Sequence, residues 1–180
     1  MDALAATRMW LDRAVIGLDL CPFARAPAAR GQVRFALSGA SDWPTLLGDL
    51  RSELALIAAA EPAEVETTLL VCPDVPASFD AFNQFLDDAD EAVRSQGLEG
   101  VIQVASFHPQ YRFADAPEDD VAHATNRSPW PTLHLLREDS VERAVLAVPD
   151  PAAIYEANMR TLRALTAEGW ERLSAAWRAG

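Results

Sequence analysis

Two patterns of apolar residues alternate along most of the chain. Where apolar side chains recur every three or four residues, the pattern predicts amphipathic helices. Where apolar and β-branched residues run together over short stretches, it predicts buried strands. The predicted helices cover 2–19, 41–60 and 78–96, with a shorter one at 139–145. The predicted strands cover 32–37, 67–72, 101–107 and 132–136.

The order strand, helix, strand, helix, strand is typical of crossover units in a parallel sheet. We therefore predict a single α/β domain over 1–180, with a small mixed, mainly parallel four-stranded sheet flanked by helices. Helices 41–60 and 78–96 are the expected crossovers. No crossover helix directly precedes the fourth strand, so we expect it to run antiparallel at or near an edge. Residues 151–179 form a predicted C-terminal helical segment, with a break expected at Gly169.

Composition narrows the classes of partner. The chain has 180 residues and a net charge of −12, and all of its 15 basic side chains are arginine. This charge argues against nucleic acid and against anionic membrane surfaces as partners. The absence of lysine excludes Schiff-base chemistry and a phosphate-loop lysine. The charged N-terminal stretch is typical of neither a signal peptide nor a membrane span, so we expect a cytoplasmic protein with reduced thiols at Cys21 and Cys72.

Side chains that can do chemistry concentrate in one segment, Phe107 to Glu138. It holds all three histidines, several arginines and the polar triad Asn126-Arg127-Ser128, which stands directly before Pro129-Trp130-Pro131. Most of the segment, residues 108–131, is predicted to be a long loop. Long loops in compact domains tend to be functional, so this is where we expect a site.

The predicted strand order gives that site a location. In open α/β sheets, sites form just beyond the carboxyl ends of the parallel strands. Cys72 ends the second predicted strand, and His108 follows the third. If the fourth strand is antiparallel, the residues that lead into it, 126–131, lie over the same end. We therefore expect all of these groups to meet at one rim of the sheet.

The residue types at this rim predict a small cytoplasmic enzyme that acts on an anionic small-molecule substrate. His108 is the expected general acid or base, Arg127 the holder of the anion, and Cys72 or Cys21 the thiol nucleophile. Further substrate-binding side chains are expected at the rim: Gln110, Tyr111, Asn126, Ser128, Trp130 and Arg137. No motif identifies a reaction class, a cofactor, a metal or an oligomeric state.

Each assignment has a plainer alternative. Cys72 could be an inert buried thiol, and the arginines could pair with the acidic run 115–120. Four side chains are ligand types that zinc prefers: Cys21, Cys72, His108 and His134. Their spacing matches no compact zinc motif, and His134 in mid-strand fits a structural role. The competing function is a non-catalytic protein that binds a small ligand or a metal in the same pocket. A third is a partner-binding scaffold that uses Trp170 and Trp177.

Three blocks of sequence resemble a known family. They are LCPFA at 20–24, VASFHPQYRFA at 104–114 and NRSPWPTLHLLRE at 126–138. On these blocks the chain resembles, nearly end to end, the bacterial proteins catalogued as domain-of-unknown-function family 1415. The resemblance implies a small bacterial cytoplasmic protein and supplies no catalytic residues. It also draws Cys21, Pro22 and Phe23 toward the rim, where the strand order alone does not place them.

Overall fold

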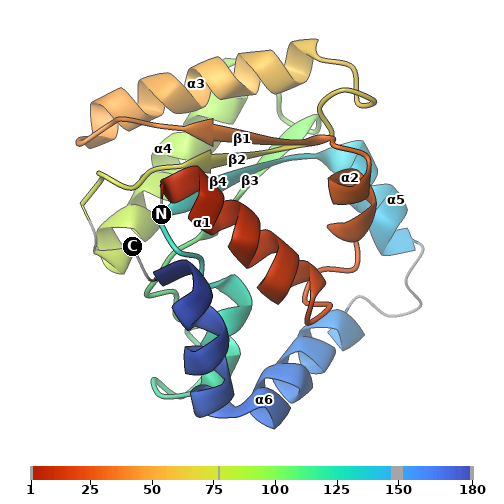
Figure 1. Cartoon of the computed structure of the whole chain (residues 1–180). Coiled ribbons are helices and arrows are strands. Elements are labelled where there is room, and N and C mark those ends of the chain that lie inside the picture. Colours follow the sequence, from red (N-terminus) through yellow and green to blue (C-terminus); the bar gives the residue numbers. More distant parts are fainter. Residues whose placement is uncertain (1, 77, 147–151, 179–180) are drawn as a thin grey trace.

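The computed structural model describes residues 2–76, 78–146 and 152–178, and its elements are drawn in Figure 1. Four strands form one sheet: β1 (Val33–Leu37), β2 (Thr67–Val71), β3 (Ile102–Phe107) and β4 (Thr132–Arg137). The α-helices are α1 (Ala3–Trp10), α2 (Arg25–Ala29), α3 (Trp43–Ala59), α4 (Phe79–Ser95), α5 (Glu138–Leu146) and α6 (Ala152–Arg178). A π-helix, η1 (Leu11–Ile16), continues α1, and a 3₁₀ helix, η2 (Val121–Asn126), precedes β4.

The predicted elements are largely confirmed. All four strands are present, and so are the helices predicted at 41–60, 78–96 and 139–145, each with its ends shifted by at most 2 residues. The N-terminal helix stops at Ile16 rather than at residue 19, and the short helices α2 and η2 were not predicted. The predicted limits of the C-terminal helical segment, 151 and 179, lie outside the described residues.

Helix α3 illustrates why these segments fold as they do. The carboxylate of Asp42 accepts a hydrogen bond from the backbone N–H of Thr45 at 2.8 Å, which caps the first turn. The apolar stripe then points inward, and four of its side chains are fully buried: Leu46, Leu50, Leu54 and Ile57. Periodicity and cap together therefore fix both the start of this helix and the face that it buries.

The sheet is mixed, and the prediction of a mainly parallel sheet is wrong. Its strand order is β1-β2-β4-β3, with β1 and β2 parallel and both pairings of β4 antiparallel. The antiparallel direction of β4 and its place near an edge are as predicted, because β4 lies one strand in from the edge strand β3. Its insertion between β2 and β3 makes two of the three strand pairings antiparallel. The physical reason is that β2 and β3 run the same way one strand apart, so both have an edge to fill. The apolar run of β4 fills this place, with Leu133 and Leu135 fully buried on the side of α3 and α4.

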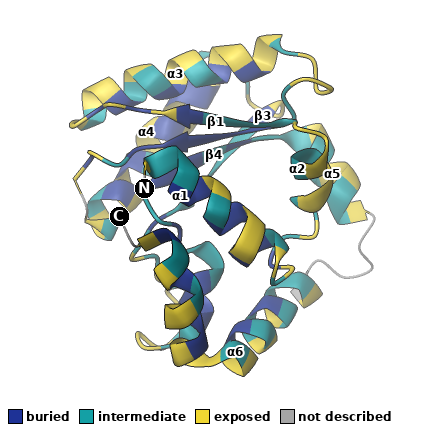
Figure 2. Cartoon of the chain, in the orientation of Figure 1, coloured by how far each residue is buried: buried dark blue, intermediate teal, exposed yellow. Residues whose placement is uncertain are grey.

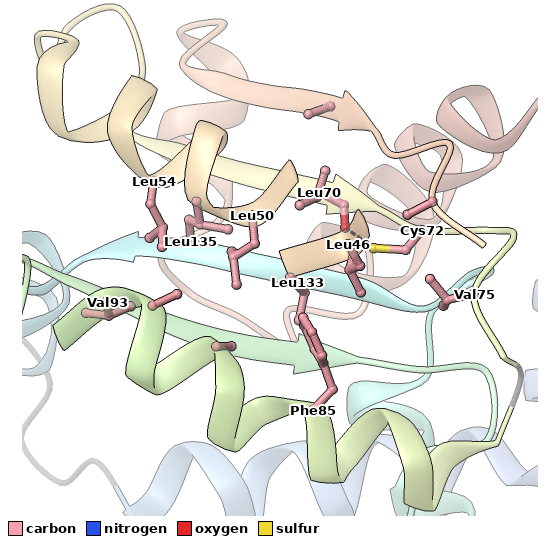
Figure 3. Close-up of a cluster of buried hydrophobic side chains, with 14 of the residues drawn as sticks. Leu46, Leu50, Leu54, Leu70, Cys72, Val75, Phe85, Val93, Leu133 and Leu135 are labelled. Carbon is pink, nitrogen blue, oxygen red and sulfur yellow. Dashed lines mark hydrogen bonds between the residues drawn. The ribbon is translucent and has the colours of Figure 1, made fainter. Parts of the chain in front are cut away.

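The helices divide between the two faces of the sheet (Figures 1 and 2). Helices α3 and α4 pack on one face, and Figure 3 shows the apolar core between them and the sheet, with Leu70, Leu133 and Leu135 facing α3 and α4. On the other face α1 packs against β1 and β2, and α6 packs against α1 and η2. A second apolar cluster, around Trp10 and Leu162, fills this side. Helix α1 leaves part of this face over β3 and β4 open, where Gln103, Ala105 and His134 line a cavity.

The longest helix, α6, is bent. Its break is at Thr166, with φ 67° and ψ 163°, and not at Gly169 as predicted. Positive φ is rare for a branched residue, and it persists only where the surroundings hold it. Here the Thr166 hydroxyl accepts a hydrogen bond from the N–H of Gly169 at 3.3 Å, which caps the second half of the helix. Within the described ranges, no helix combines the length and the apolar character needed to cross a membrane.

Candidate functional site

The ends of β2 and β3 and the start of β4 meet at one end of the sheet. The N–H of Cys72 donates to the carbonyl of Pro131 at 2.9 Å, and the N–H of His108 donates to the carbonyl of Asn126 at 3.1 Å. Phe107 pairs with Thr132 in the register of β3 and β4. The backbone therefore brings Cys72, His108 and residues 126–131 to the same rim.

Cys72 points away from solvent at this rim. Its side chain is fully buried in the core between the sheet and helices α3 and α4 (Figure 3). The thiol donates to the carbonyl of Leu70 at 3.3 Å. Burial raises the pKa of Cys72 to about 12, so the thiol carries its proton at neutral pH. This environment favours the alternative of an inert packed thiol over a nucleophile.

His108 is also buried, with 1% of its surface exposed. Its Nδ1 accepts a hydrogen bond from the N–H of Gln110 at 3.0 Å, so the proton of the neutral ring is on Nε2. Nε2 is buried and has no partner among the described residues, and the ring packs between Phe79 and Phe82. Burial lowers the pKa of His108 to about 4, which keeps the ring neutral.

A cleft of about 550 Å³, the rim cleft, opens beside His108. It is lined by Ser78, Phe79, Asp80, Pro109, Gln110, Arg112, Glu118 and Arg127. Arg127 is half-buried and donates from Nε to the carbonyl of Tyr111 at 3.2 Å. Burial lowers the pKa of Arg127, and the positive charge of Arg178 acts in the same direction. Within the part of the chain that the structure describes, no carboxylate lies within 4.0 Å of the Arg127 guanidinium.

Two predicted rim residues are engaged in the turn before β4. The Ser128 hydroxyl donates to the carbonyl of Trp130 at 2.6 Å, and the hydroxyl of Thr132 donates to the same oxygen at 2.9 Å. Ser128 is buried, and the indole Nε1 of Trp130 is buried without a described partner. These contacts hold the turn in shape, so the hydroxyl of Ser128 is not free for a ligand.

The long loop 108–131 is ordered by its middle histidine. Nδ1 of His123 accepts from the N–H of Phe113 at 3.1 Å, and Nε2 donates to the carbonyl of Pro117 at 2.8 Å. Both ring nitrogens are therefore used within the loop. His123 therefore braces the loop internally, and the loop contains the short helix η2 before its last residues, 127–131, lead into β4.

A larger cavity, of about 1040 Å³, lies on the opposite face of the sheet from α3 and α4; we call it the sheet-face cavity. Its floor is formed by side chains of β2, β3 and β4 on that face: Thr67, Leu69, Gln103, Ala105, Phe107, His134 and Leu136. The surrounding walls come from the α1–η1 segment, the loop 20–24, α2, α5 and α6, and Leu86 of α4 also lines the cavity. Figure 1 shows α2 and α5 at the same end of the sheet.

Four of the predicted site residues line the sheet-face cavity: Cys21, Tyr111, Asn126 and Arg137. The block 20–24 thus reaches the same cavity as parts of 104–114 and 126–138, although it does not reach the rim cleft. Cys21 is half-buried, and burial raises the pKa of its thiol. Arg137 is already engaged, because it donates to the carbonyls of Ile57, Ala60 and Val65 at the end of α3.

His134, for which the sequence predicts a structural role, is a floor residue of the sheet-face cavity. Its Nε2 lies 2.8 Å from the hydroxyl oxygen of Thr67, and that hydroxyl also lies 2.8 Å from the carbonyl of Leu135. The single hydroxyl proton can serve only one acceptor, and the carbonyl has no proton to offer. Thr67 therefore donates to Leu135, and His134 donates from Nε2 to Thr67. Burial lowers the pKa of His134 to about 4, so the ring is neutral with its lone pair on Nδ1.

Charge at the sheet-face cavity has the opposite sign to the whole protein. Its ionic lining side chains are Arg30, Arg137, Arg143 and Glu66. Arg30 and Arg143 are exposed, and among the described residues neither has a carboxylate within 4.0 Å. Among the described residues, Arg143 donates to the hydroxyl of Ser140, at 2.9 Å. In a chain of net charge −12, this is a local cationic mouth.

The sequence contained a signal for His134 but none for the arginines. In the run Thr132-Leu133-His134-Leu135-Leu136, strand alternation puts His134 on the face opposite Leu133 and Leu135. A polar residue at such a position indicates that this face is not fully covered by apolar packing. Arg30 follows the short helix α2, and Arg143 lies on α5, where nothing in the local pattern distinguishes them from surface arginines.

The described residues offer no cluster of side chains for the alternative of a metal site. The two thiols are free and face different sides of the sheet, since Cys72 packs with α3 and α4 and Cys21 packs with the α1 side. In the described parts of the chain, no three His, Cys, Asp or Glu side chains gather closely enough to hold a metal ion.

Comparison with known proteins agrees with the resemblance seen in the sequence. The family model DUF1415, described as a protein of unknown function, matches residues 2–172, and the chain therefore belongs to this family. No curated protein and no solved structure matches the chain.

Proposed function

We propose that this protein binds a small organic anion in the sheet-face cavity. The apolar part of the ligand would lie on the floor, and its charged group would stay at the mouth beside Arg30 and Arg143. The observation that carries the proposal is that Arg30 and Arg143, at the mouth of a mainly apolar cavity in an acidic protein, have no carboxylate within 4.0 Å among the described residues. Cavities of roughly this size, apolar with a few polar groups, are typical of small-molecule sites.

The chemistry of the cavity supports binding more strongly than catalysis. A thiol needs to ionise to act as a nucleophile, and burial opposes this at Cys21. A general base needs a pKa near the working pH, and burial holds that of His134 well below it. Both groups are therefore neutral polar contacts for a ligand, which favours non-catalytic ligand binding, the competing function considered from the sequence.

The enzymatic function predicted from the sequence is a second candidate, and it would use the rim cleft. What supports it is Arg127, which is half-buried, has no described carboxylate partner and lines the cleft together with Gln110. Such a guanidinium can hold a carboxylate or phosphate. His108 would act on that substrate only if the loop moved, because its ring is buried behind the cleft wall.

Two fluorescent probes of the same shape test the first proposal. Anilinonaphthalene sulfonate is an apolar anion, and N-phenylnaphthylamine has the same apolar body without the charge. We expect the folded protein to prefer the sulfonate, and Arg30→Gln with Arg143→Gln to reduce that preference roughly tenfold, as loss of a charge-assisted contact does. Arg94→Gln, at an exposed surface ion pair, is the matched control.

A third variant separates the two candidate sites. If Arg127→Gln removes sulfonate binding and the mouth variant does not, the anion binds in the rim cleft and the enzymatic candidate gains support. If neither variant changes the preference for the anion while the melting temperature stays constant, the proposed cavity site is wrong.

A further inference from the structure

We infer that the ligand of the sheet-face cavity carries a neutral hydrogen-bond donor on its apolar body, a hydroxyl or an N–H, which donates to Nδ1 of His134. The inference rests on the proposed function and specifies its ligand class. It divides the ligand into an anionic end at the mouth and a donor deeper in the cavity.

The hydrogen-bond chain from His134 through Thr67 to Leu135 has a fixed direction. His134 donates to Thr67, and Thr67 donates to the carbonyl of Leu135, with both distances at 2.8 Å. Because Thr67 has only one proton and gives it to a backbone carbonyl within the sheet, the tautomer of His134 is set by the fold. A bound group therefore meets a lone pair at Nδ1 and not an N–H.

The lone pair on Nδ1 of His134 is accessible from the cavity and is not used by a described donor. His134 lines the cavity, and among the described residues no donor lies within hydrogen-bond distance of its Nδ1. Other polar atoms without partners are sealed inside the protein: Thr68 Oγ1, His108 Nε2, Thr125 Oγ1, Trp130 Nε1 and Trp170 Nε1. Nδ1 of His134 is not one of these sealed atoms. It is an acceptor that faces the cavity.

The residues around His134 on the cavity floor are apolar. In the register of the sheet His134 stands between Leu69 and Ala105, and its ring lies 5.6 Å from that of Phe107. A ligand that covers this floor displaces water from Nδ1. If it brought no donor, it would leave a buried acceptor unpaired, which is costly. A neutral ring also gives an anionic group no reason to bind here, so the charge stays with the mouth arginines.

A pair of matched probes tests this specificity. Hydroxynaphthoate and methoxynaphthoate, substituted at the same carbon of the ring remote from the carboxylate, have the same charge and apolar body. Only the first has a donor. We expect the wild-type protein to bind the hydroxy compound about threefold to tenfold more tightly in a calorimetric titration. Arg94→Gln, at an exposed surface ion pair outside the cavity, should keep this preference.

Two variants address the direction of the hydrogen bond. His134→Phe keeps a ring of similar shape and should bind both probes equally. Thr67→Val removes the acceptor that fixes the tautomer, so the preference should shrink even if the phenylalanine variant does not fold. Equal binding of both probes to the wild type, or a preference that persists in both variants, overturns the inference and leaves the proposed function standing. Failure of both anions to bind would overturn the two together.

Discussion

The guanidinium of Arg163 donates to the carboxylate of Asp120 at 2.6 Å, and this contact joins α6 to η2 across 43 residues of sequence. The other oxygen of Asp120 accepts from the N–H of Ala122 at 2.9 Å and so caps η2. The Asp120 side chain is only 9% exposed. Hydrogen bonding from Arg163 and then from Ala122 lowers the pKa of Asp120, so the carboxylate is charged at neutral pH.

We predict that Asp120→Ala lowers the free energy of unfolding by about 1–2 kcal/mol, because it removes a helix cap together with an ion pair. Asp120→Asn keeps an oxygen that can cap η2 and should cost less. The neighbouring exposed Asp119→Ala is the control. Urea unfolding measures all three, and equal stability of the Asp120 and Asp119 variants would contradict the prediction.

Acid should destabilise the protein through two histidines. Burial lowers the pKa of both His108 and His134 from 6.5 to about 4. Below pH 6.5 both histidines bind protons more readily in the unfolded chain than in the folded protein. The contribution of the two neutral histidines to stability is therefore complete above pH 6.5 and is lost as the pH falls toward about 4. The loss should amount to about a few kcal/mol in total.

Urea unfolding across this pH range checks the sign. His134→Gln should show a weaker loss of stability on acidification than the wild type, although it starts from a lower value. Protonation of carboxylates also relieves the repulsion in this acidic chain, but it does so in both proteins, so the difference between them isolates the histidine. If the stability of the two proteins falls in parallel with pH, the pKa of His134 is not lowered by folding, and the prediction is wrong.

Arg137 is predicted to be a structural residue at the end of α3. Its Nη2 lies 2.7 Å from the carbonyls of both Ile57 and Ala60, and 3.0 Å from that of Val65. Arg137→Lys keeps the charge but loses the planar fork, so we expect a loss of about 2 kcal/mol in stability. Arg94→Lys is the control. If stability is unchanged and binding of anilinonaphthalene sulfonate falls, Arg137 instead holds a ligand, as the sequence predicted.

The two thiols should differ in reactivity. Cys72 should react with iodoacetamide only after unfolding, because its thiol is fully buried and protonated. Cys21 should react slowly in the folded protein, faster as the pH rises, and more slowly again with anilinonaphthalene sulfonate bound, because it lines the sheet-face cavity. Mass spectrometry after timed labelling distinguishes the two sites. Rapid labelling of native Cys72 would restore its predicted role as a nucleophile.

Local pattern was enough to predict most of the elements. The apolar stripe of α3, from Leu46 to Ile57, predicts a helix and its buried face, and the continuous apolar run of β2 predicts a buried strand. The insertion of β4 between β2 and β3 could not be predicted in the same way, because it depends on an empty place between two strands that the chain has already passed. The bend of α6 falls at Thr166 rather than at Gly169, and no glycine or proline at the bend marks it in the sequence.

The candidate site was predicted in part for the same reason. Strand ends locate the backbone, and Cys72, His108 and residues 126–131 do meet at one end of the sheet. Strand alternation then decides where each side chain points, and it turns Cys72 into the core. The sheet-face cavity is formed where α2, α5 and the loop 20–24 close over a floor built from three strands, β2, β3 and β4, and no short pattern encodes that arrangement.

The inner position of β4 also sets an order of events during synthesis. Among the described strands, β3 has β4 as its one neighbour in the sheet, so the strand at 102–107 gains this partner after residues 132–137 have been made. Up to that moment the nascent chain carries two unfilled edges, on β2 and β3, and such edges invite pairing with other chains. The long loop 108–131 must then carry its strand back into the gap. A chain shortened at residue 126 would therefore lose the centre of its sheet, and not merely an edge.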